Sequence, residues 1–279
     1  MTDIDFEHFL RLVRTRSGLA LTAEKAYLVN SRLAPIARAA GAPNVAALLT
    51  QLRCGASEDL VRSCVDAMAT HESFFFRDGT PFDLLTRHVL PRLIQARASR
   101  RALRIWCAAC SSGQEPYSIA IVLQEHAAQL AGWNLQIVAT DMSVGILEKA
   151  SRGLYSDFEV KRGLSEARLE RWFSREDGAW RIAPELQAIV EFRPHNLLHG
   201  IGGLGAFDII FCRNVLIYFD VDQKRTILAG LSKALAADGA LFMGSAETVL
   251  GVTDAFQLTP GLPGLFRPNP AATAVNGAA

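Results

Sequence analysis

Residues 103–120 of this 279-residue chain read LRIWCAACSSGQEPYSIA. The segment begins with a short apolar run at Leu103–Ala108, passes through a turn of small residues, and continues as an apolar helical pattern from Pro116 to Leu130. A short apolar strand that is followed by a turn and a helix is the repeating unit of a parallel sheet. This stretch therefore predicts the first strand and helix of an α/β domain.

The same order of strand, turn and helix recurs along the rest of the chain. Parallel strands that are joined by right-handed helical crossovers form a doubly wound sheet, which is covered by helices on both faces. The Asp238-Gly239 pair predicts a turn just before the last strand. Strands are predicted at Leu135–Thr140, Ile189–Arg193, Phe207–Cys212 and Ala240–Met243, and helices at Val144–Ser151 and Gln223–Ala236.

Residues 1–70 follow a different pattern, in which every predicted element is a helix. Phe6, Phe9 and Val13 recur at the spacing that places them on one face of a helix. Gly18 is well suited to end that helix as its C-terminal cap. Further helices are predicted at 23–40, 45–53 and 58–69.

A second interruption of the α/β pattern lies between Tyr155 and Gln187. Here Trp172-Phe173 and Trp180-Arg181 flank an Asp177-Gly178 turn, which predicts two short antiparallel strands in a small inserted subdomain. The small and polar residues of the C-terminal tail predict a frayed segment. The expected organisation is a helical domain over 1–70, a linker over 71–90, an α/β domain over 91–268 with an insertion at about 155–190, and a tail over 269–279.

The overall composition is that of a globular protein. Hydrophobic residues make up 50% of the chain and charged residues 20%, and a formal net charge of +1 is far from the basic excess of a bulk nucleic-acid binder. The first residues are acidic and do not resemble a signal peptide, and no run approaches the roughly 18 apolar residues of a membrane span. We therefore expect a soluble, monomeric cytoplasmic protein that neither enters a membrane nor binds nucleic acid.

Cys107 and Cys110 form a single C-x-x-C motif. A redox or zinc pair is one interpretation, and two small side chains in a tight loop is the other. Zinc requires a second pair of ligands, and the other cysteines do not supply the matching spacing. We favour the structural interpretation and expect no metal site.

Polar residues follow each predicted strand, at the edge where doubly wound sheets bind ligands. Asp141 follows the second strand and is placed to accept hydrogen bonds from ribose hydroxyls, although it could instead start a helix, for which Ser143 is the more obvious cap. Glu115 lies in the first turn of a helix, where an acid is favoured by the helix dipole alone. Asn196 and the Arg213-Asn214 pair follow later strands.

The turn after the first strand lacks the features of a phosphate-binding loop. Neither G-x-G-x-x-G nor G-K-[ST] is present, so the cradle for a dinucleotide pyrophosphate or a nucleoside triphosphate is missing. A nucleoside without phosphate groups fits acids and amides at these positions, and S-adenosylmethionine is such a nucleoside.

Four ordered motifs resemble the CheR family, the bacterial chemotaxis protein-glutamate O-methyltransferases. The resemblance extends from the N-terminal helices to about residue 267 and rests on Thr70–Asp78 (THESFFFRD), Ser111–Ala120 (SSGQEPYSIA), Ala139–Asp141 (ATD) and Phe207–Phe219 (FDIIFCRNVLIYF). It implies a class I methyltransferase domain of doubly wound α/β fold, an all-helical N-terminal domain that docks substrate, and a small inserted antiparallel β-subdomain. It also implies S-adenosylmethionine as cofactor and S-adenosylhomocysteine as product.

The resemblance assigns roles to individual positions. Arg77 and Tyr218 would be catalytic, with Tyr218 beside the reacting methyl group. His71 stands where the family usually has Asn, and Ser73 where it usually has Thr; Ser keeps the hydroxyl, but a neutral His nitrogen either donates or accepts and cannot do both. The implied cofactor contacts are His71, Ser73, Arg77, Glu115, Asp141, Asn196, Leu197, Arg213 and Asn214.

The implied reaction is methyl transfer to glutamate side chains on the cytoplasmic helices of chemoreceptors. A methyltransferase for another substrate and a cofactor-binding signalling adaptor without turnover are the alternatives. Such receptor helices are acidic, and a basic face on the N-terminal domain would steer them. Between Arg11 and Arg53 a single acid, Glu24, accompanies seven basic residues: Arg11, Arg14, Arg16, Lys25, Arg32, Arg38 and Arg53.

Overall fold

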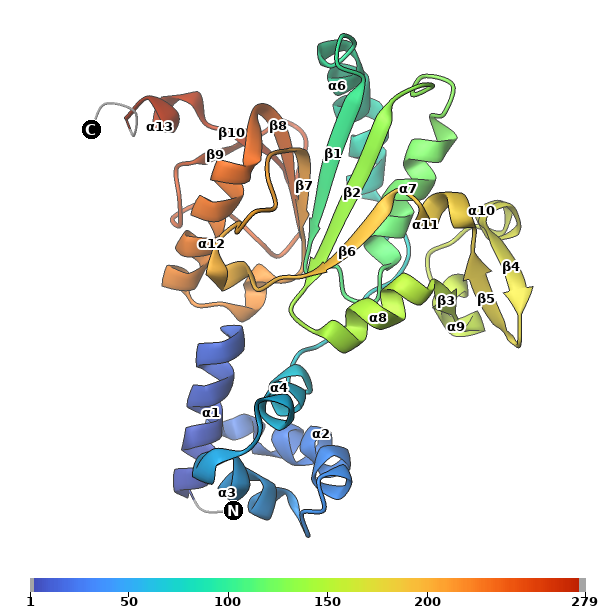
Figure 1. Ribbon diagram of the computed structural model, residues 1–279. Coiled ribbons are helices and arrows are strands. Elements are labelled where there is room, and N and C mark those ends of the chain that lie inside the picture. Colours follow the sequence, from blue (N-terminus) through green and yellow to red (C-terminus); the bar gives the residue numbers. More distant parts are fainter. Residues whose placement is uncertain (1–2, 276–279) are drawn as a thin grey trace. The chain divides into compact units, whose positions relative to one another are not determined.

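The computed structural model describes residues 3–275 and divides into two compact units. One unit comprises the chain up to Thr70 together with the short segment Tyr218–Gln223, and the other comprises His71–Ile217 and the chain from Lys224 onward. No helix among the described residues is long and apolar enough to cross a membrane. Figure 1 labels the elements of both units.

The N-terminal unit is a bundle of short helices, as the sequence predicts. Helix α1 (Asp3–Ser17) packs against α3 (Val45–Gly55) and α4 (Glu58–Asp66), and α2 (Ala26–Ala39) packs against the same two helices. Its core contains apolar residues from each of the four helices: Phe9, Val13, Val29, Leu33, Leu48, Leu49, Val61 and Val65. Gly18 follows α1 with a φ of 77°, and its N–H donates to the carbonyl of Arg14.

Several of the basic residues in this unit have internal partners, which corrects the prediction of an open basic face. Arg14 pairs with Asp220, Arg16 with Glu58 and Arg53 with Asp5. Arg32 donates to three consecutive carbonyl groups, those of residues 67–69, and so caps the chain after α4. Arg11, Lys25 and Arg38 are exposed, and their role in steering a substrate stays a prediction.

The second unit is built on a seven-stranded sheet with the order β6-β2-β1-β7-β8-β10-β9 (Figure 1). Its first five strands are parallel, and β10 and β9 are added in antiparallel orientation. This confirms the doubly wound α/β class, with two edge strands that the sequence did not reveal. The strands are β1 (Ala102–Ala108), β2 (Asn134–Asp141), β6 (Val190–Pro194), β7 (Phe207–Cys212), β8 (Leu235–Met243), β9 (Phe256–Leu258) and β10 (Leu265–Pro268).

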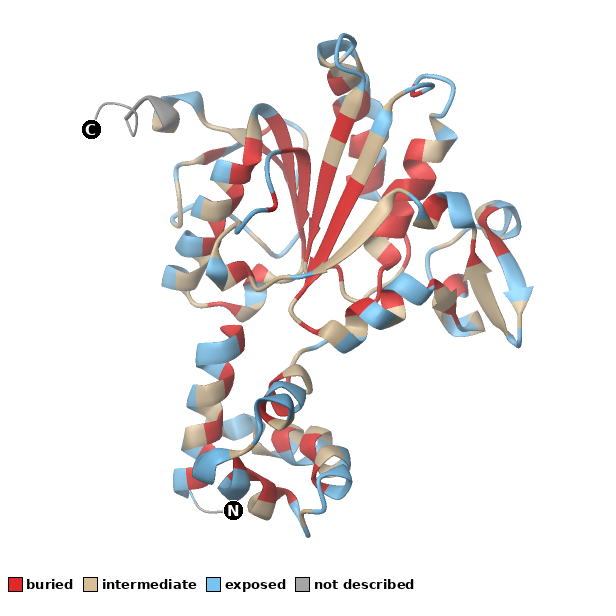
Figure 2. Cartoon of the chain, in the orientation of Figure 1, coloured by how far each residue is buried: buried red, intermediate tan, exposed pale blue. Residues whose placement is uncertain are grey.

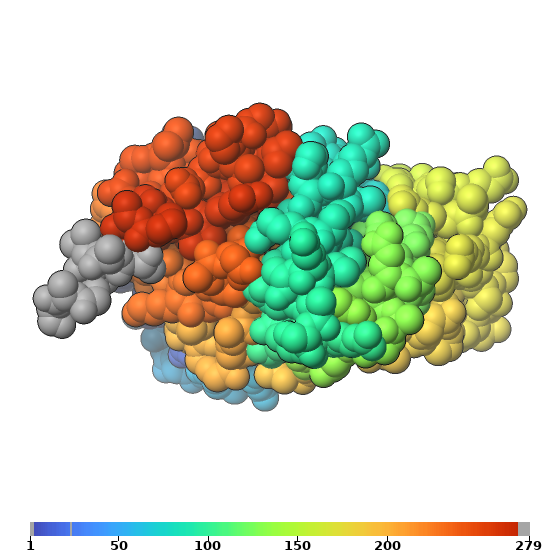
Figure 3. Space-filling model, turned by 90° about the horizontal axis from the view of Figure 1, so that it is seen from above, coloured from blue at the N-terminus to red at the C-terminus, as the bar shows by residue number. Residues whose placement is uncertain are grey.

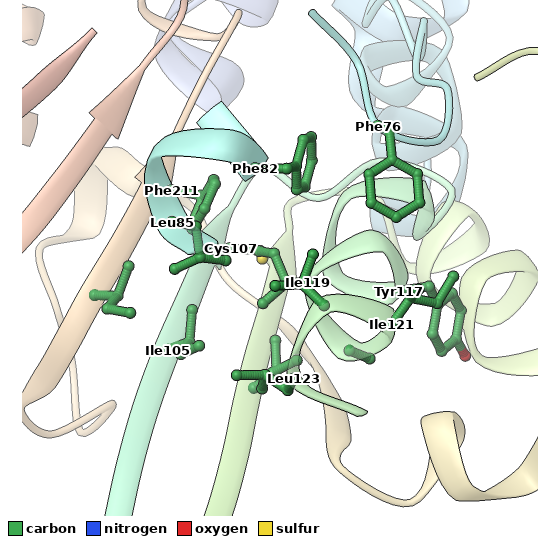
Figure 4. Close-up of a cluster of buried hydrophobic side chains, with 14 of the residues drawn as sticks. Phe76, Phe82, Leu85, Ile105, Cys107, Tyr117, Ile119, Ile121, Leu123 and Phe211 are labelled. Atoms are coloured by element: carbon green, nitrogen blue, oxygen red, sulfur yellow. The ribbon is translucent and has the colours of Figure 1, made fainter. Parts of the chain in front are cut away.

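The parallel strands are apolar on both faces because helices cover both. Ile105 and Cys107 point into a buried cluster with Ile119 and Leu123 of α7 (Gln114–Glu125), as Figure 4 shows. Trp106, which alternates with them, stacks on Phe207 at 5.4 Å between ring centroids. The central strands are accordingly buried almost throughout (Figure 2). The other helices of this unit are α5 (Thr80–Leu84), α6 (Leu90–Ala96), α8 (Val144–Arg152), α11 (Pro184–Gln187), α13 (Pro270–Val275) and, from Lys224 onward, α12 (Val221–Ala234), with a π-helix at Leu85–Val89.

A second, three-stranded sheet forms the predicted insertion. Strands β4 (Phe173–Glu176) and β5 (Ala179–Ile182) make the antiparallel hairpin around Asp177-Gly178, and β3 (Leu154–Tyr155), which was not predicted, pairs with β5. Helices α9 (Asp157–Lys161) and α10 (Glu166–Trp172) complete the subdomain. Seen from above, the yellow insertion and the red C-terminal segment lie on opposite sides of the teal segment that contains α6 (Figure 3).

Two local predictions were wrong. Helix α7 ends at Glu125 rather than Leu130. The predicted Asp238-Gly239 turn lies inside β8, at an irregularity where the register shifts and Asp238 forms an ion pair with Arg97. Within the tail predicted as frayed, Pro270–Val275 forms the short helix α13, and the Asn269 side chain before it accepts from Ala271 N–H and donates to the Asp254 carbonyl. Fraying of the tail stays a prediction. Residues 276–279 of that tail lie outside the described residues.

Gly163 is a position where the insertion lies directly against the linker. Its φ is 99°, and a Cβ atom there would overlap the carbonyl oxygen of Phe75. We predict that Gly163→Ala lowers the free energy of unfolding by about 3 kcal/mol, through overpacking and left-handed strain. Chemical denaturation measures this loss.

The matched control is Gly178→Ala in the hairpin of the same insertion. Gly178 also has a positive φ, of 79°, but nothing lies within 4 Å of the position that a Cβ atom would take there. Strain alone should therefore cost about 1 kcal/mol. An equal loss of unfolding free energy in the two variants would show that the Phe75 carbonyl does not exclude a Cβ atom at position 163.

Candidate functional site

Asp141 is the last residue of β2 and is nearly buried. Its Oδ2 accepts from the N–H of Ser111 at 2.9 Å, and its Oδ1 accepts from the N–H of Ser143 at 3.1 Å. Ser143 is the N-cap residue of α8, as the sequence suggests, but its side chain makes no capping bond among the described residues, and its N–H donates to Asp141 instead. The carboxylate is fixed in position and keeps lone pairs that can accept further hydrogen bonds.

The loop between β1 and α7 owes its shape to backbone of positive φ. Ala109, Ser111 and Gly113 have φ values of 61°, 51° and 92°. At Gly113 a Cβ atom would lie 3.0 Å from both the Cβ of Ala150 and the hydroxyl of Tyr155, so a larger residue would strain the turn. The hydroxyl oxygen of Ser111 is buried and has no hydrogen-bond partner among the described residues.

Arg213 directly follows β7, and its guanidinium group connects two other segments. It donates to the carboxylates of Glu115 and Asp78, each at 2.7 Å, and to the carbonyl of Arg77 at 3.0 Å. Burial raises the pKa of Glu115, and the charge of Arg213 opposes that rise. Glu115 therefore pairs with a buried cation. Its position in the first turn of a helix, where the helix dipole favours an acid, did not predict this pairing.

The segment after β6 supplies the next predicted residues. The N–H of His195 donates to the carbonyl of Asp141, so this segment lies beside the end of β2. The Asn196 side chain accepts from the N–H of Leu198 at 3.0 Å, and Leu197 is buried. Asp141, Asn196, Leu197, Glu115, Arg213 and Asn214 thus all belong to the carboxyl edge of the sheet, as predicted from the order of strands.

Glu247 is an important residue of this edge that the sequence analysis missed. Its carboxylate accepts four backbone N–H groups: those of Asn214 and Gly244 at Oε2, and those of Val215 and Leu216 at Oε1, at 2.6–2.9 Å. A Cβ on Gly244 would lie 2.7 Å from Glu247 Oε2, so glycine is required for this approach. The sequence does contain a signal for Glu247: like Asp141, it is an acid at or shortly after the end of a parallel strand.

The linker is anchored by its phenylalanines. The Phe75 ring is buried and makes edge contacts with Tyr155 and Phe173 at 5.0 and 5.4 Å, and the Phe76 N–H donates to the hydroxyl of Ser118. Arg77 turns back to donate to the carbonyl of Glu72. His71 and Ser73 are half-buried on the same linker, and their cofactor contacts stay predictions.

Tyr218 is grouped with the N-terminal helices rather than with the sheet. It ends a short 3₁₀ turn, and its carbonyl accepts from the N–H of Ala20. Its catalytic role stays a prediction.

The cysteines of the C-x-x-C motif are buried thiols. Burial raises the pKa of both Cys107 and Cys110 well above the ordinary range of a cysteine, which disfavours the thiolate that metal binding and redox chemistry require. Among the described residues no group of three His, Cys, Asp or Glu side chains could hold a metal ion.

Comparison with known protein families identifies the family to which this chain belongs. Residues 71–263 match the S-adenosylmethionine-binding domain of CheR methyltransferases, and residues 4–69 match the all-alpha domain of the same enzymes. The chain belongs to the CheR methyltransferase family. The two matched regions together cover both units of the structure.

Individual relatives agree with the family assignment. The chain is 41% identical over 268 residues to chemotaxis protein methyltransferase 1 of Pseudomonas aeruginosa, covering 94% of this chain and 96% of that protein. It is 39% identical to chemotaxis protein methyltransferase Cher2 of Pseudomonas putida, covering 95% and 97%. A solved TehB-like methyltransferase from Corynebacterium glutamicum aligns with 64% of this chain and 86% of its own at 16% identity, with a TM-score of 0.37 that is too low to support a conclusion.

S-adenosylmethionine is the cofactor of this CheR domain, and the strand-end residues fit it. Asp141 presents a fixed carboxylate for ribose hydroxyls, and Asn196 presents an amide. The buried Ser111 hydroxyl and the Nε of Arg213 both lack partners among the described residues, as is expected of groups that a ligand satisfies. Asp141, Asn196, Arg213 and the Ser111 loop are therefore the residues that would hold the cofactor.

Glu247 should support cofactor binding indirectly, because its carboxylate holds the backbone of the turn at Asn214–Leu216. In Glu247→Gln one carboxylate oxygen becomes an NH₂ group, which faces two N–H donors and cannot accept from them. We predict a loss of about 1–3 kcal/mol in the free energy of unfolding, with weaker binding of S-adenosylhomocysteine. Denaturation and calorimetry measure the two effects.

The control for this prediction is Glu185→Gln, which changes an exposed carboxylate in the first turn of α11. That variant should match the wild type in both measurements. Unchanged cofactor affinity in Glu247→Gln would mean that the loop of Asn214–Leu216 does not contribute to the cofactor site.

Proposed function

We propose that this CheR methyltransferase transfers a methyl group from S-adenosylmethionine to glutamate carboxylates on the cytoplasmic helices of chemoreceptors. The observation that carries the proposal is similarity to chemotaxis protein methyltransferases over 95% of the chain, which includes the helical unit as well as the cofactor-binding unit. The enzyme would act as a monomer in the cytoplasm, where these receptor helices lie.

The proposed reaction does not require the enzyme to transfer a proton. The cofactor supplies an activated methyl group on a sulfonium. A glutamate side chain has an ordinary pKa of about 4.3 and is already a nucleophilic carboxylate at neutral pH, so no general base is needed. The contribution of the protein is alignment of a mobile side chain, which can lower the barrier substantially. The absence of a catalytic His-Asp pair from the predicted site residues is consistent with this chemistry.

Arg77 and Tyr218 are the proposed substrate-handling residues. A guanidinium group binds a carboxylate with two parallel hydrogen bonds, and Arg77 carries such a group on the linker. The Tyr218 hydroxyl can donate a hydrogen bond to orient the attacking oxygen. The exposed cations Arg11, Lys25 and Arg38 would attract the acidic receptor helices.

The direct test is incubation of the purified chain with methyl-labelled S-adenosylmethionine and membranes that contain chemoreceptors. Label on a receptor-sized band that is released by mild base is expected, because methyl esters are base-labile. Label that resists base, or that appears on nucleic acid or a small molecule, would favour another substrate. Cofactor binding without any transfer would favour the signalling adaptor.

Tyr218→Phe should separate catalysis from cofactor binding. Because the lost hydroxyl is assigned to the attacking carboxylate, we predict a decrease in kcat of about tenfold or more with little change in the affinity for S-adenosylhomocysteine. Single-turnover kinetics and calorimetry on the same preparation measure the two quantities. A decrease in affinity alone would make Tyr218 a binding or packing residue.

A further inference from the structure

Two arginines of the cofactor-binding unit lie over the Phe74 ring, and both form hydrogen bonds with Glu72. The guanidinium carbon of Arg162 lies 4.1 Å from the ring centroid, and that of Arg77 lies 5.4 Å from it. Arg162 donates to the Glu72 carboxylate at 2.7 Å, while Arg77 donates to the Glu72 carbonyl at 3.0 Å. We refer to Glu72, Phe74, Arg77 and Arg162 as the Phe74 cluster.

The backbone that carries Arg162 is fixed in place. Gly163, the next residue, packs so tightly on the Phe75 carbonyl that a Cβ cannot be accommodated. Phe75 itself is buried against Tyr155 and Phe173 of the insertion. Stacking on Phe74 further restricts the guanidinium group, so less conformational entropy is lost when it binds a ligand.

The charges of the cluster favour an additional carboxylate. Two cations face one acid, and the pKa of Glu72 is lowered by its hydrogen bond and charge interaction with Arg162 and by the charge of Arg77. The ion pair is exposed, with 41% of the Arg162 side chain and 55% of the Glu72 side chain accessible. Exposed ion pairs contribute little to stability, so another carboxylate can replace Glu72 at small cost.

Other stacked arginines of the insertion differ in one important respect. Arg175 lies over Trp180 at 4.1 Å and pairs with Asp157, but Asp157 also accepts a hydrogen bond from the Trp180 ring at 2.7 Å. Arg168 lies over Phe76 and forms two hydrogen bonds with Glu125. The acids of these two pairs are held by more than one bond, whereas within residues 3–275 a single side-chain hydrogen bond, from Arg162, holds the Glu72 carboxylate.

The cluster adjoins the strand-end residues through Arg77, whose carbonyl accepts from Arg213. We infer that Arg162, held against Phe74, forms a binding site for a carboxylate side chain that flanks the methylated glutamate, and that Glu72 occupies this site until the substrate replaces it. The inference rests on the proposed function, because it identifies the substrate as an acidic protein segment. The insertion thereby contributes a residue, Arg162, to substrate recognition.

The test measures KM for a purified receptor cytoplasmic fragment, together with kcat and the affinity for S-adenosylhomocysteine. Arg162→Glu should raise KM about tenfold and leave kcat and cofactor affinity near the wild-type values, with a smaller effect at high salt. Glu72→Gln should lower KM about threefold, because it removes the internal competitor. The matched controls, Arg175→Glu and Asp157→Asn, alter the equivalent pair over Trp180 and should leave KM unchanged.

The opposite signs at Arg162 and Glu72 distinguish a binding site from a structural ion pair. A rise in KM for Glu72→Gln, or an unchanged KM for Arg162→Glu, would overturn the inference while the proposed function stands. Equal effects of Arg162→Glu and Arg175→Glu would also overturn it, since they would report a general loss of charge or of folding. Failure of the wild-type chain to methylate the receptor fragment would overturn the proposed function and this inference together.

Discussion

The buried guanidinium group of Arg213 is the interaction on which the candidate site depends. A buried charge is costly unless it is paired and hydrogen-bonded, and here the partners come from two segments far apart in the sequence, the linker at Arg77-Asp78 and the first turn of α7 at Glu115. The same residue follows β7 directly. One side chain therefore fixes the linker, the helix that follows β1 and the end of β7 in a single arrangement.

Glu247 supports this arrangement from the other side. Its carboxylate satisfies four backbone N–H groups around the turn after β7, and backbone donors in such a turn have no strand partner of their own. Phe75 and Gly163 join the linker to the insertion in the same unit. The linker is thus held by the sheet edge through Arg213 and by the insertion through its aromatic residues, which places the Phe74 cluster next to the proposed cofactor site.

The sequence predicts well those features that depend on local pattern. The apolar runs of β1, β2, β6 and β7 identify the parallel strands, and their order places Asp141, Asn196 and Arg213 at one edge. The local sequence pattern does not predict features that depend on contacts between residues far apart in the chain. Strand β9 has only three residues and is held by its pairing with β10, Glu247 is recognisable only by its bonds to residues 214–216, and the capping role of Arg32 depends on residues 67–69. The positions of His71 and Ser73 rested on family resemblance alone, and within the described part of the chain neither side chain is hydrogen-bonded to Asp141 or Arg213.

The central claim is that the carboxyl ends of the parallel strands bind S-adenosylmethionine around Asp141. The most direct measurement is calorimetric titration of the wild-type chain and of Asp141→Ala with S-adenosylhomocysteine, with thermal unfolding as a check that the variant is folded. One saturable site is expected in the wild type, and loss of the carboxylate should reduce the binding free energy by about 1–3 kcal/mol, which is the scale of a hydrogen bond to a charged group. Equal affinity in a folded Asp141→Ala variant would contradict the claim.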